Sequence, residues 1–150
     1  MLSTYVRYLA WLGTAPQSPD RQALNATEPV TRLAKMEQEG LTPSFPACPA
    51  HHIIQYLMEM GPVEPAGMDF APISWTTMHC WQGMTGITLK PWEARLIRQL
   101  SIEYLDETRK ARKPDCPSPW TAEISDTQRE AVSAKIRSIF GGLARNRVQA

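Results

Sequence analysis

The sequence predicts an all-α fold, a small bundle of about five or six helices joined by proline-rich loops. Three observations lead to this class. Apolar residues recur at spacings of three and four in several segments, 13 prolines cluster between those segments, and 43% of the residues are apolar against 21% charged. A chain of 150 residues can bury one hydrophobic core. We therefore expect a single helical domain over residues 1–150, with a central unit at about 50–112 and peripheral helices in 1–48 and 120–150.

The N-terminal third is expected to contribute two helices. Ser3 to Leu12 places apolar and aromatic side chains at helical spacing, and Gly13 can end this helix. Thr31 to Glu39 can form a short second helix, which Gly40 can terminate. The proline-rich stretches on either side of this second helix are expected to be loops.

A third helix is expected over residues 50–60, where four apolar residues form one stripe and Gly61-Pro62 ends the pattern. The stripe consists of Ile53, Ile54, Leu57 and Met58. The next segment, Gly61 to Pro72, is too rich in glycine and proline for a regular element. It is expected to be an irregular connection, and no part of the chain predicts a β-hairpin.

Two further helices carry three of the five tryptophans. Ser74 is a suitable N-cap for a helix from Trp75 to Met84, and Gly86 can terminate it. The longest helix should run from Pro91 to about Arg112, because proline in the first turn costs no hydrogen bond. Its inward stripe is expected to comprise Trp92, Leu96, Ile97, Leu100 and Tyr104. Its outward face is expected to carry the charged residues Arg95, Arg98, Glu103, Asp106 and Glu107.

The C-terminal part is expected to add one more helix. Lys113-Pro114 should end the long helix, and the proline-rich linker 115–119 follows. Ser125 to Gln128 has the form of a capping box and leads into an amphipathic pattern over Ala131 to Leu143. Residues from Arg145 onward are expected to fray.

Charge and cysteine content narrow the class of partner and the compartment. The net charge of +1 combines two segments of +3 each, Lys90 to Lys113 and Ser125 to Ala150, with −5 in the rest of the chain. The basic excess of these two segments suits an acidic partner but is too small for a dedicated nucleic-acid domain. Three cysteines without paired spacing predict reduced thiols, and no apolar run reaches membrane-spanning length. We therefore expect a soluble, unprocessed protein inside a cell.

No residue pattern supports catalysis or a bound metal. The candidate zinc ligands are Cys48, His51, His52, His79 and Cys80. Zinc ligands usually come in pairs two to four residues apart, whereas His79 and Cys80 are adjacent on a helix and point about 100° apart. A cysteine nucleophile would need a histidine base, and no family signature for such a pair is present. We expect no enzyme activity, no metal and no cofactor.

The last two predicted helices and the turn at Gly86 also have the layout of a DNA-binding helix-turn-helix. However, the second helix begins with Pro91-Trp92-Glu93, which is apolar and acidic where base-reading residues should lie. Its basic residues cluster at the far end, from Arg109 to Lys113, where they would support only non-specific contact with DNA. The pattern argues against nucleic-acid recognition.

The three tryptophans of these helices, Trp75, Trp81 and Trp92, have two alternative roles. Aromatic residues at helical spacing most often fill a core. Alternatively, they form an exposed groove for a partner, a use to which tryptophan, methionine and arginine side chains are suited. The sequence leaves these two roles open.

A block of motifs between residues 50 and 120 is specific enough to compare with a known family. Its residues are Gly61-Pro62, Pro72-Ile73-Ser74-Trp75, Cys80-Trp81, Thr85-Gly86-Ile87, Leu89, Pro91-Trp92-Glu93, Ile97, Leu100-Ser101 and Tyr104-Leu105. The block resembles the tail assembly chaperones, or tail assembly proteins, encoded near the tape measure gene of tailed phages and prophages. Two positions depart from the family pattern, because Thr77 replaces a frequent acidic residue and Lys90 a frequent threonine. Each change should weaken a capping box by about 1 kcal/mol.

The resemblance implies a factor that assists tail assembly in the cytoplasm of the bacterial host. It would bind the tape measure protein or a tail tube protein and shield apolar helical surface, without catalysis. The partner-binding residues would be Trp75, Trp81 and Trp92 as anchors and Arg95, Arg98 and Arg109 at the rim. Two alternatives remain, a small phage protein that binds a host factor or DNA, and a structural component of the virion.

Overall fold

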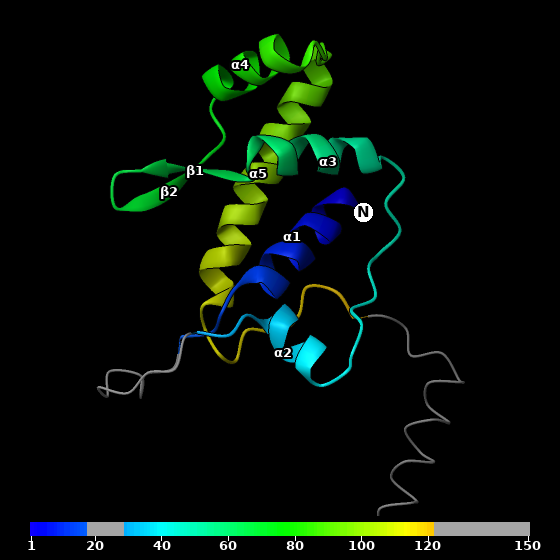
Figure 1. The fold of residues 1–150 in the computed structure, drawn as a ribbon, viewed down its shortest axis with the longest axis vertical. Helices are drawn as coiled ribbons and strands as arrows, with labels where there is room; N and C mark the ends of the chain where they lie inside the picture. The colour runs from blue at the N-terminus through cyan, green and yellow to red at the C-terminus, as the bar shows by residue number, and fades with distance from the viewer. Residues whose placement is uncertain (18–28, 122–150) are drawn as a thin grey trace, which may run out of the picture.

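The computed structural model describes residues 1–17 and 29–121. Within them the chain forms five helices and one two-stranded sheet (Figure 1). In chain order the elements are α1 (Leu2–Gly13), α2 (Arg32–Gln38), α3 (His51–Met60), β1 (Val63–Ala66), β2 (Asp69–Pro72), α4 (Trp75–Thr85) and α5 (Pro91–Ala111). The helix predicted over Ala131 to Leu143 and its capping box at Ser125 to Gln128 lie outside the described residues.

The long helix α5 organises the molecule. With 21 residues it spans about 30 Å at 1.5 Å per residue, and α1, α3 and both strands pack against it. In Figure 1, α4 lies beyond α3 at the N-terminal end of α5, and α2 lies near the C-terminal end. None of the helices in the described ranges is both long and apolar enough to cross a membrane.

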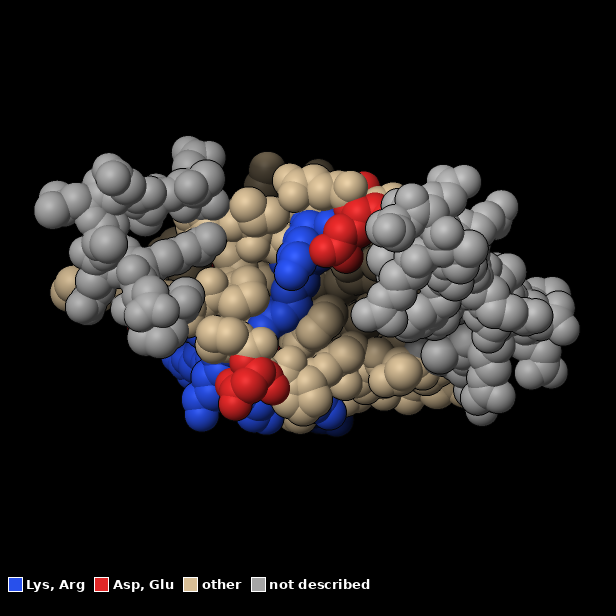
Figure 2. Space-filling model, turned by 90° about the horizontal axis from the view of Figure 1, so that it is seen from below, with Lys and Arg blue, Asp and Glu red and all other residues tan. Residues whose placement is uncertain are grey.

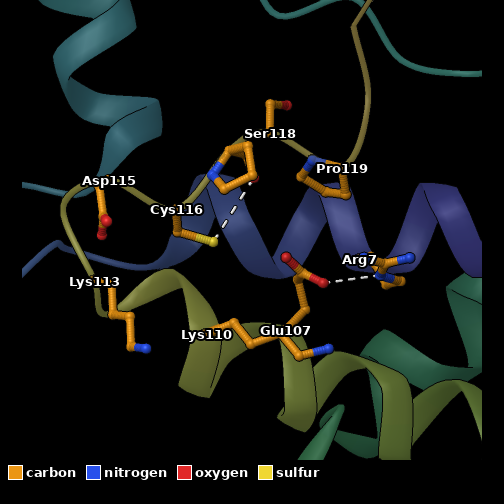
Figure 3. A pocket seen from close by; sticks show the side chains of 9 residues that line it. Arg7, Glu107, Lys110, Lys113, Asp115, Cys116, Ser118 and Pro119 are labelled. Carbon is orange, nitrogen blue, oxygen red and sulfur yellow. Dashed lines mark hydrogen bonds and ion pairs between the residues drawn. The ribbon is translucent and has the colours of Figure 1, made fainter.

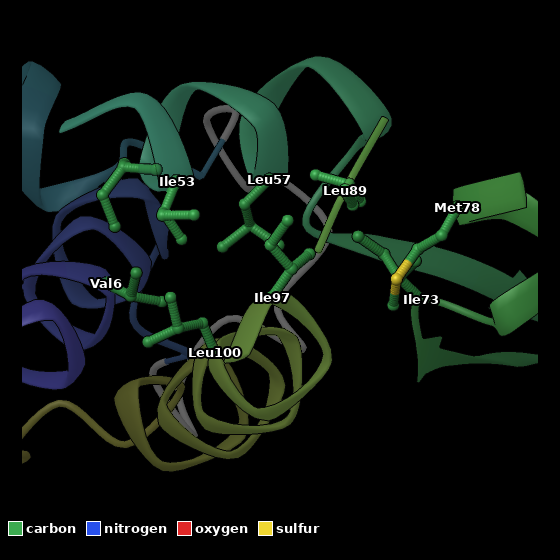
Figure 4. Close-up of a cluster of buried hydrophobic side chains, with 9 residues drawn as sticks. Val6, Ile53, Leu57, Ile73, Met78, Leu89, Ile97 and Leu100 are labelled. Atoms are coloured by element: carbon green, nitrogen blue, oxygen red, sulfur yellow. The ribbon is translucent and has the colours of Figure 1, made fainter. Parts of the chain in front are cut away.

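The hydrophobic core lies between α1, α3 and α5, and residues near the hairpin and on α4 extend it (Figure 4). Its buried members are Val6, Ile53, Ile54, Leu57, Ile73, Met78, Leu89, Ile97 and Leu100. The apolar stripes predicted for residues 50–60 and for the long helix supply most of them. Ile73 and Leu89 come from the short connections on either side of α4, so these connections are fixed to the core by buried side chains.

The prediction of an all-α fold is wrong, because Val63–Ala66 and Asp69–Pro72 form an antiparallel β-hairpin. The two strands are joined by Gly67 and Met68, and Gly67 has a φ of +64°. A glycine with positive φ at the first position of a two-residue loop matches the twist of a hairpin. The density of prolines suggested an irregular connection. Both strands are edge strands, however, where a proline is tolerated when its missing N–H faces away from the partner strand.

Two residues of α5 also differ from their predicted environments. Trp92, expected on the inward stripe, has 52% of its surface exposed, because it lies on the first turn of the helix. Glu107, expected on the outward face, is only 3% exposed, and its carboxylate accepts a hydrogen bond from Nε of Arg7 at 2.8 Å. The α1–α5 contact therefore includes a partly buried ion pair as well as apolar packing.

At the C-terminal end of α5, the buried Arg32 of α2 joins the ends of two helices. Its guanidinium donates to the carbonyl oxygen of Thr14, just after α1, at 3.2 Å, and to that of Lys113, just after α5, at 2.9 Å. It also lies 4.7 Å from the ring centroid of Trp11. Carbonyl groups at helix C-termini lack partners within the helix, so a cation is favourable there. Burial lowers the pKa of Arg32 from its ordinary value.

Candidate partner-binding surface

Helix α4 presents most of its surface to solvent. Of its 11 residues, only Met78 is buried. Trp75 has 53% of its surface exposed and Met84 has 88%. A helix with one buried side chain and two large exposed apolar residues has an apolar surface that the fold of the described residues does not use.

The first turn of α4 is held by a carboxylate from the hairpin. Ser74 is the N-cap, and its Oγ accepts a hydrogen bond from the backbone N–H of Thr77 at 3.1 Å. Glu64, on β1, accepts at one oxygen from the Thr77 hydroxyl at 2.7 Å and from the Ser74 backbone N–H at 3.2 Å. These hydrogen bonds, that of Thr77 first, lower the pKa of Glu64.

This arrangement changes the interpretation of Thr77. A capping box normally takes its carboxylate from the third residue after the N-cap, the position that Thr77 occupies. In this chain the carboxylate of Glu64 accepts from the N-cap N–H instead, although it lies ten residues before Ser74 in the sequence. The loss expected from Thr77 is therefore offset by a strand residue. At the start of α5, Glu93 accepts from the backbone N–H of Lys90 at 2.7 Å, so half of that capping box is present.

The structure brings together Trp75 and Arg98, two of the residues predicted to bind a partner. The guanidinium carbon of Arg98 lies 5.5 Å from the ring centroid of Trp75, within the range of a cation–π contact. Nη1 of Arg98 donates a hydrogen bond to the backbone carbonyl of Ile73. The guanidinium of Arg98 is therefore held by a hydrogen bond to the backbone, and the Trp75 indole lies against this guanidinium with about half of the tryptophan surface exposed.

The other two tryptophans have different environments. Trp92 and Arg95 are both exposed on the first turns of α5. Trp81 is partly buried, packs against the core and has its ring centroid 5.0 Å from that of Tyr56. The sequence left core packing and an exposed surface as alternatives for each tryptophan. Trp81 packs against the core, whereas Trp75 and Trp92 are exposed.

Arg109 lies apart from the other predicted residues. It is 11 residues after Arg98 on the same helix, or about 16 Å away at 1.5 Å per residue. Its Nη2 contacts the carboxylate of Asp69 at 2.7 Å and the carbonyl of Phe70 at 3.3 Å. Arg109 therefore contacts the hairpin from α5 through a solvent-exposed ion pair and does not lie beside Trp75.

Three hairpin residues were not predicted from the sequence. Met68, in the turn, is fully exposed, Phe70 is exposed on β2, and Glu64 supports α4. A signal for them was present in the sequence, because a glycine followed by one residue between two short extended segments is typical of a tight hairpin. Pro65 and Pro72 obscured it.

A hollow of about 440 Å³ lies at the C-terminal end of α5, away from α4 (Figure 3). Residues of α1, the last turns of α5 and the segment 113–119 line it, and the Arg7–Glu107 ion pair lies at one side. On the face seen from below, basic side chains are interspersed with acidic ones (Figure 2). The described part of the chain contains no group of three histidine, cysteine, aspartate or glutamate residues that could hold a metal ion.

Residues 46–106 match a family model described as phage tail assembly chaperone. No curated protein and no solved structure matches the chain. The match confirms the resemblance inferred from the motif block. It spans α3, the hairpin, α4 and most of α5, and so contains Trp75, Trp92, Arg95 and Arg98 but not Arg109.

Proposed function

We propose that this protein, whose residues 46–106 match the phage tail assembly chaperones, binds a tail protein and shields its apolar helical surface during tail morphogenesis. The tape measure protein or a tail tube protein is the proposed partner. Binding would take place in the host cytoplasm, before or during polymerisation. The role requires no catalysis.

The observation that carries this proposal is the exposure of two tryptophans within the matched segment. Trp75 and Trp92 each have about half of their surface in solvent, on helices whose first turns are held by side-chain hydrogen bonds. Tryptophan and arginine are the residue types most enriched where protein partners bind tightly. Because Arg98 already orients Trp75, little side-chain freedom would be lost on binding.

The roles of the predicted residues follow from their positions. Trp75 and Trp92 would contact the apolar residues of the partner, and Arg95 and Arg98 would meet acidic residues at the rim. Trp81 would support α4 by packing against Tyr56. Arg109 would contribute indirectly, through its ion pair with Asp69 of the hairpin.

The test is co-expression of the protein with the tape measure protein or the tube protein of the same phage, followed by affinity purification. We expect a complex that survives high salt, because apolar burial is not screened by ions. Trp75→Ala should weaken it by at least about tenfold, as for a central contact residue. Leu41→Ala is the matched control, since Leu41 is exposed on the loop after α2. Absence of any complex with either protein would contradict the proposal, and a steep loss of nucleic-acid binding with salt would favour DNA as the partner.

A further inference from the structure

Ser101 connects both ends of the hairpin to α5. This serine is fully buried. Its Oγ accepts a hydrogen bond from the backbone N–H of Ile73 at 2.8 Å and donates one to the carbonyl of Pro62 at 2.7 Å. Pro62 lies immediately before β1, and Ile73 immediately after β2. A single hydroxyl therefore holds together two backbone positions that lie 39 and 28 residues before it.

Ile73 is fixed by three separate interactions with the rest of the molecule. Its side chain is fully buried in the core (Figure 4). Its N–H donates to Ser101 and its carbonyl accepts from Arg98, so side chains of α5 satisfy both of its backbone polar groups. Leaving such groups buried without partners would cost free energy comparable to a lost hydrogen bond. The backbone at Ile73 therefore has little freedom to move away from α5.

The position of Ile73 sets the position of α4. The next residue, Ser74, is the N-cap, and Trp75 is the first residue of the helix. Only Met78 of α4 is fully buried, and Trp81 adds a partly buried contact with Tyr56, so few side chains of α4 itself fix the position of this helix. The start of α4 is instead held through Ile73 and through the Glu64 hydrogen bonds to Ser74 and Thr77.

We infer that Ser101 is the positioning residue of the partner-binding surface, because its hydroxyl fixes the hairpin and the start of α4 and so places Trp75 over Arg98. This inference rests on the proposed function for its consequence in binding. Its structural part, that Ser101 holds α4 in place, does not depend on any partner.

The first arm of the test measures amide hydrogen exchange in the full chain. Ser101→Ala removes two hydrogen bonds, and we expect exchange over residues 73–78 to speed up by at least about tenfold while α1 keeps its protection. Thr108→Ala is the matched control, because the Thr108 hydroxyl donates only to the carbonyl of Tyr104 on the same helix. It should leave residues 73–78 unchanged. Equal acceleration in every helix, or none at residues 73–78, would overturn the inference.

The second arm measures affinity for the co-expressed tape measure protein at a temperature where both variants are folded. Ser101→Ala should weaken binding by at least about threefold, because the apparent Kd rises threefold when the fraction of molecules with α4 in its binding position falls to about one third. Ser101→Cys, which keeps the size and a weak donor, should lie between Ser101→Ala and wild type in both arms, and it replaces the alanine variant if that variant does not fold. Faster local exchange with unchanged affinity would overturn the positioning role. If the wild-type protein binds no tail protein, the proposed function fails, and the exchange arm alone decides whether Ser101 positions α4.

Discussion

At the residue scale, the three tryptophans differ because of what lies beside each ring. Trp81 faces Tyr56 across the contact between α4 and α3, and is partly buried there. Trp75 has Arg98 against one part of its ring, and Trp92 lies on the first turn of α5. The tendency of aromatic side chains to be buried is the same at the three positions. Their exposure is therefore decided by tertiary position.

The exposure of Trp92 predicts a small effect of its removal on stability. Trp92→Ala should lower the free energy of unfolding by only about 1–2 kcal/mol, because about half of the side chain already lies in solvent. Leu100→Ala, in the fully buried part of the same helix, should lower it by about 2–5 kcal/mol. Urea denaturation followed by circular dichroism measures both. A loss of several kcal/mol for Trp92→Ala would mean that this ring contributes to the core, and its proposed contact role would then be wrong.

At the scale of elements, helix α4 depends on a strand residue for its first turn. Glu64 accepts hydrogen bonds from Ser74 and Thr77, and it does so as a carboxylate. Hydrogen bonds to the charged form hold the pKa of Glu64 below its ordinary value of 4.5. The hairpin and α4 are therefore linked by an interaction that depends on pH.

The direction of this pH dependence follows from the lowered pKa. A carboxyl whose pKa is lower in the folded state contributes stability above its unfolded pKa, and this contribution is lost as pH falls through the folded value. We expect stability to fall below about pH 4.5, and Glu64→Gln to make this fall shallower. Asp69, whose pKa is lowered by the Phe70 backbone N–H and by Arg109, contributes in the same direction.

Thermal unfolding at a series of pH values between 3 and 7 tests this, with Glu37→Gln as the control. Glu37 is exposed on α2, far from the hairpin in the sequence. Glu37→Gln should show the same change of unfolding temperature with pH as the wild type, and Glu64→Gln should show a smaller change. Identical slopes for wild type and Glu64→Gln would show that the carboxylate does not link the hairpin to α4.

The helices could be predicted from the sequence, whereas the hairpin was missed because Pro65 and Pro72 obscured its local turn signal at Gly67 and Met68. Apolar periodicity predicts α1, α3 and α5, whereas α2 and α4 are indicated mainly by local end signals such as Gly40, Ser74 and Gly86, which act within a few residues. The hairpin depends on Ser101, 28 residues beyond Ile73, and on Arg109, 40 residues beyond Asp69. Pairings over such distances leave no periodic pattern. For the same reason the sequence could nominate Trp75 and Arg98 for the site but could not place them together.

At the scale of the whole molecule, α5 joins two ends of different character. Its N-terminal end adjoins α4 and the exposed tryptophans (Figure 1). At its C-terminal end, Arg32 donates a hydrogen bond to the carbonyl of Lys113, and a hollow lies beside the Arg7–Glu107 pair (Figure 3). Helix α1 packs along α5, and its Val6 is fully buried in the core cluster with Leu100. Peripheral helices were expected in residues 1–48, and α1 supplies part of the core that supports the matched segment.

This packing predicts that the segment matching the tail assembly chaperones does not fold alone. The match begins at residue 46, so a chain of residues 46–150 would lack α1 and expose the core face of α5 that α1 covers. Besides Val6, the truncation removes the buried Tyr8 and Leu12, and each buried side chain of this size contributes about 1.5–3 kcal/mol. A typical domain has a total stability of about 5–15 kcal/mol, so the loss is large enough to unfold it. We expect the truncated chain to lose its cooperative urea transition, and a synthetic peptide of residues 1–17 to restore helical signal when added in excess. A cooperative transition without the peptide would show that α3, the hairpin, α4 and α5 form an independent unit, and α1 would then be an accessory helix.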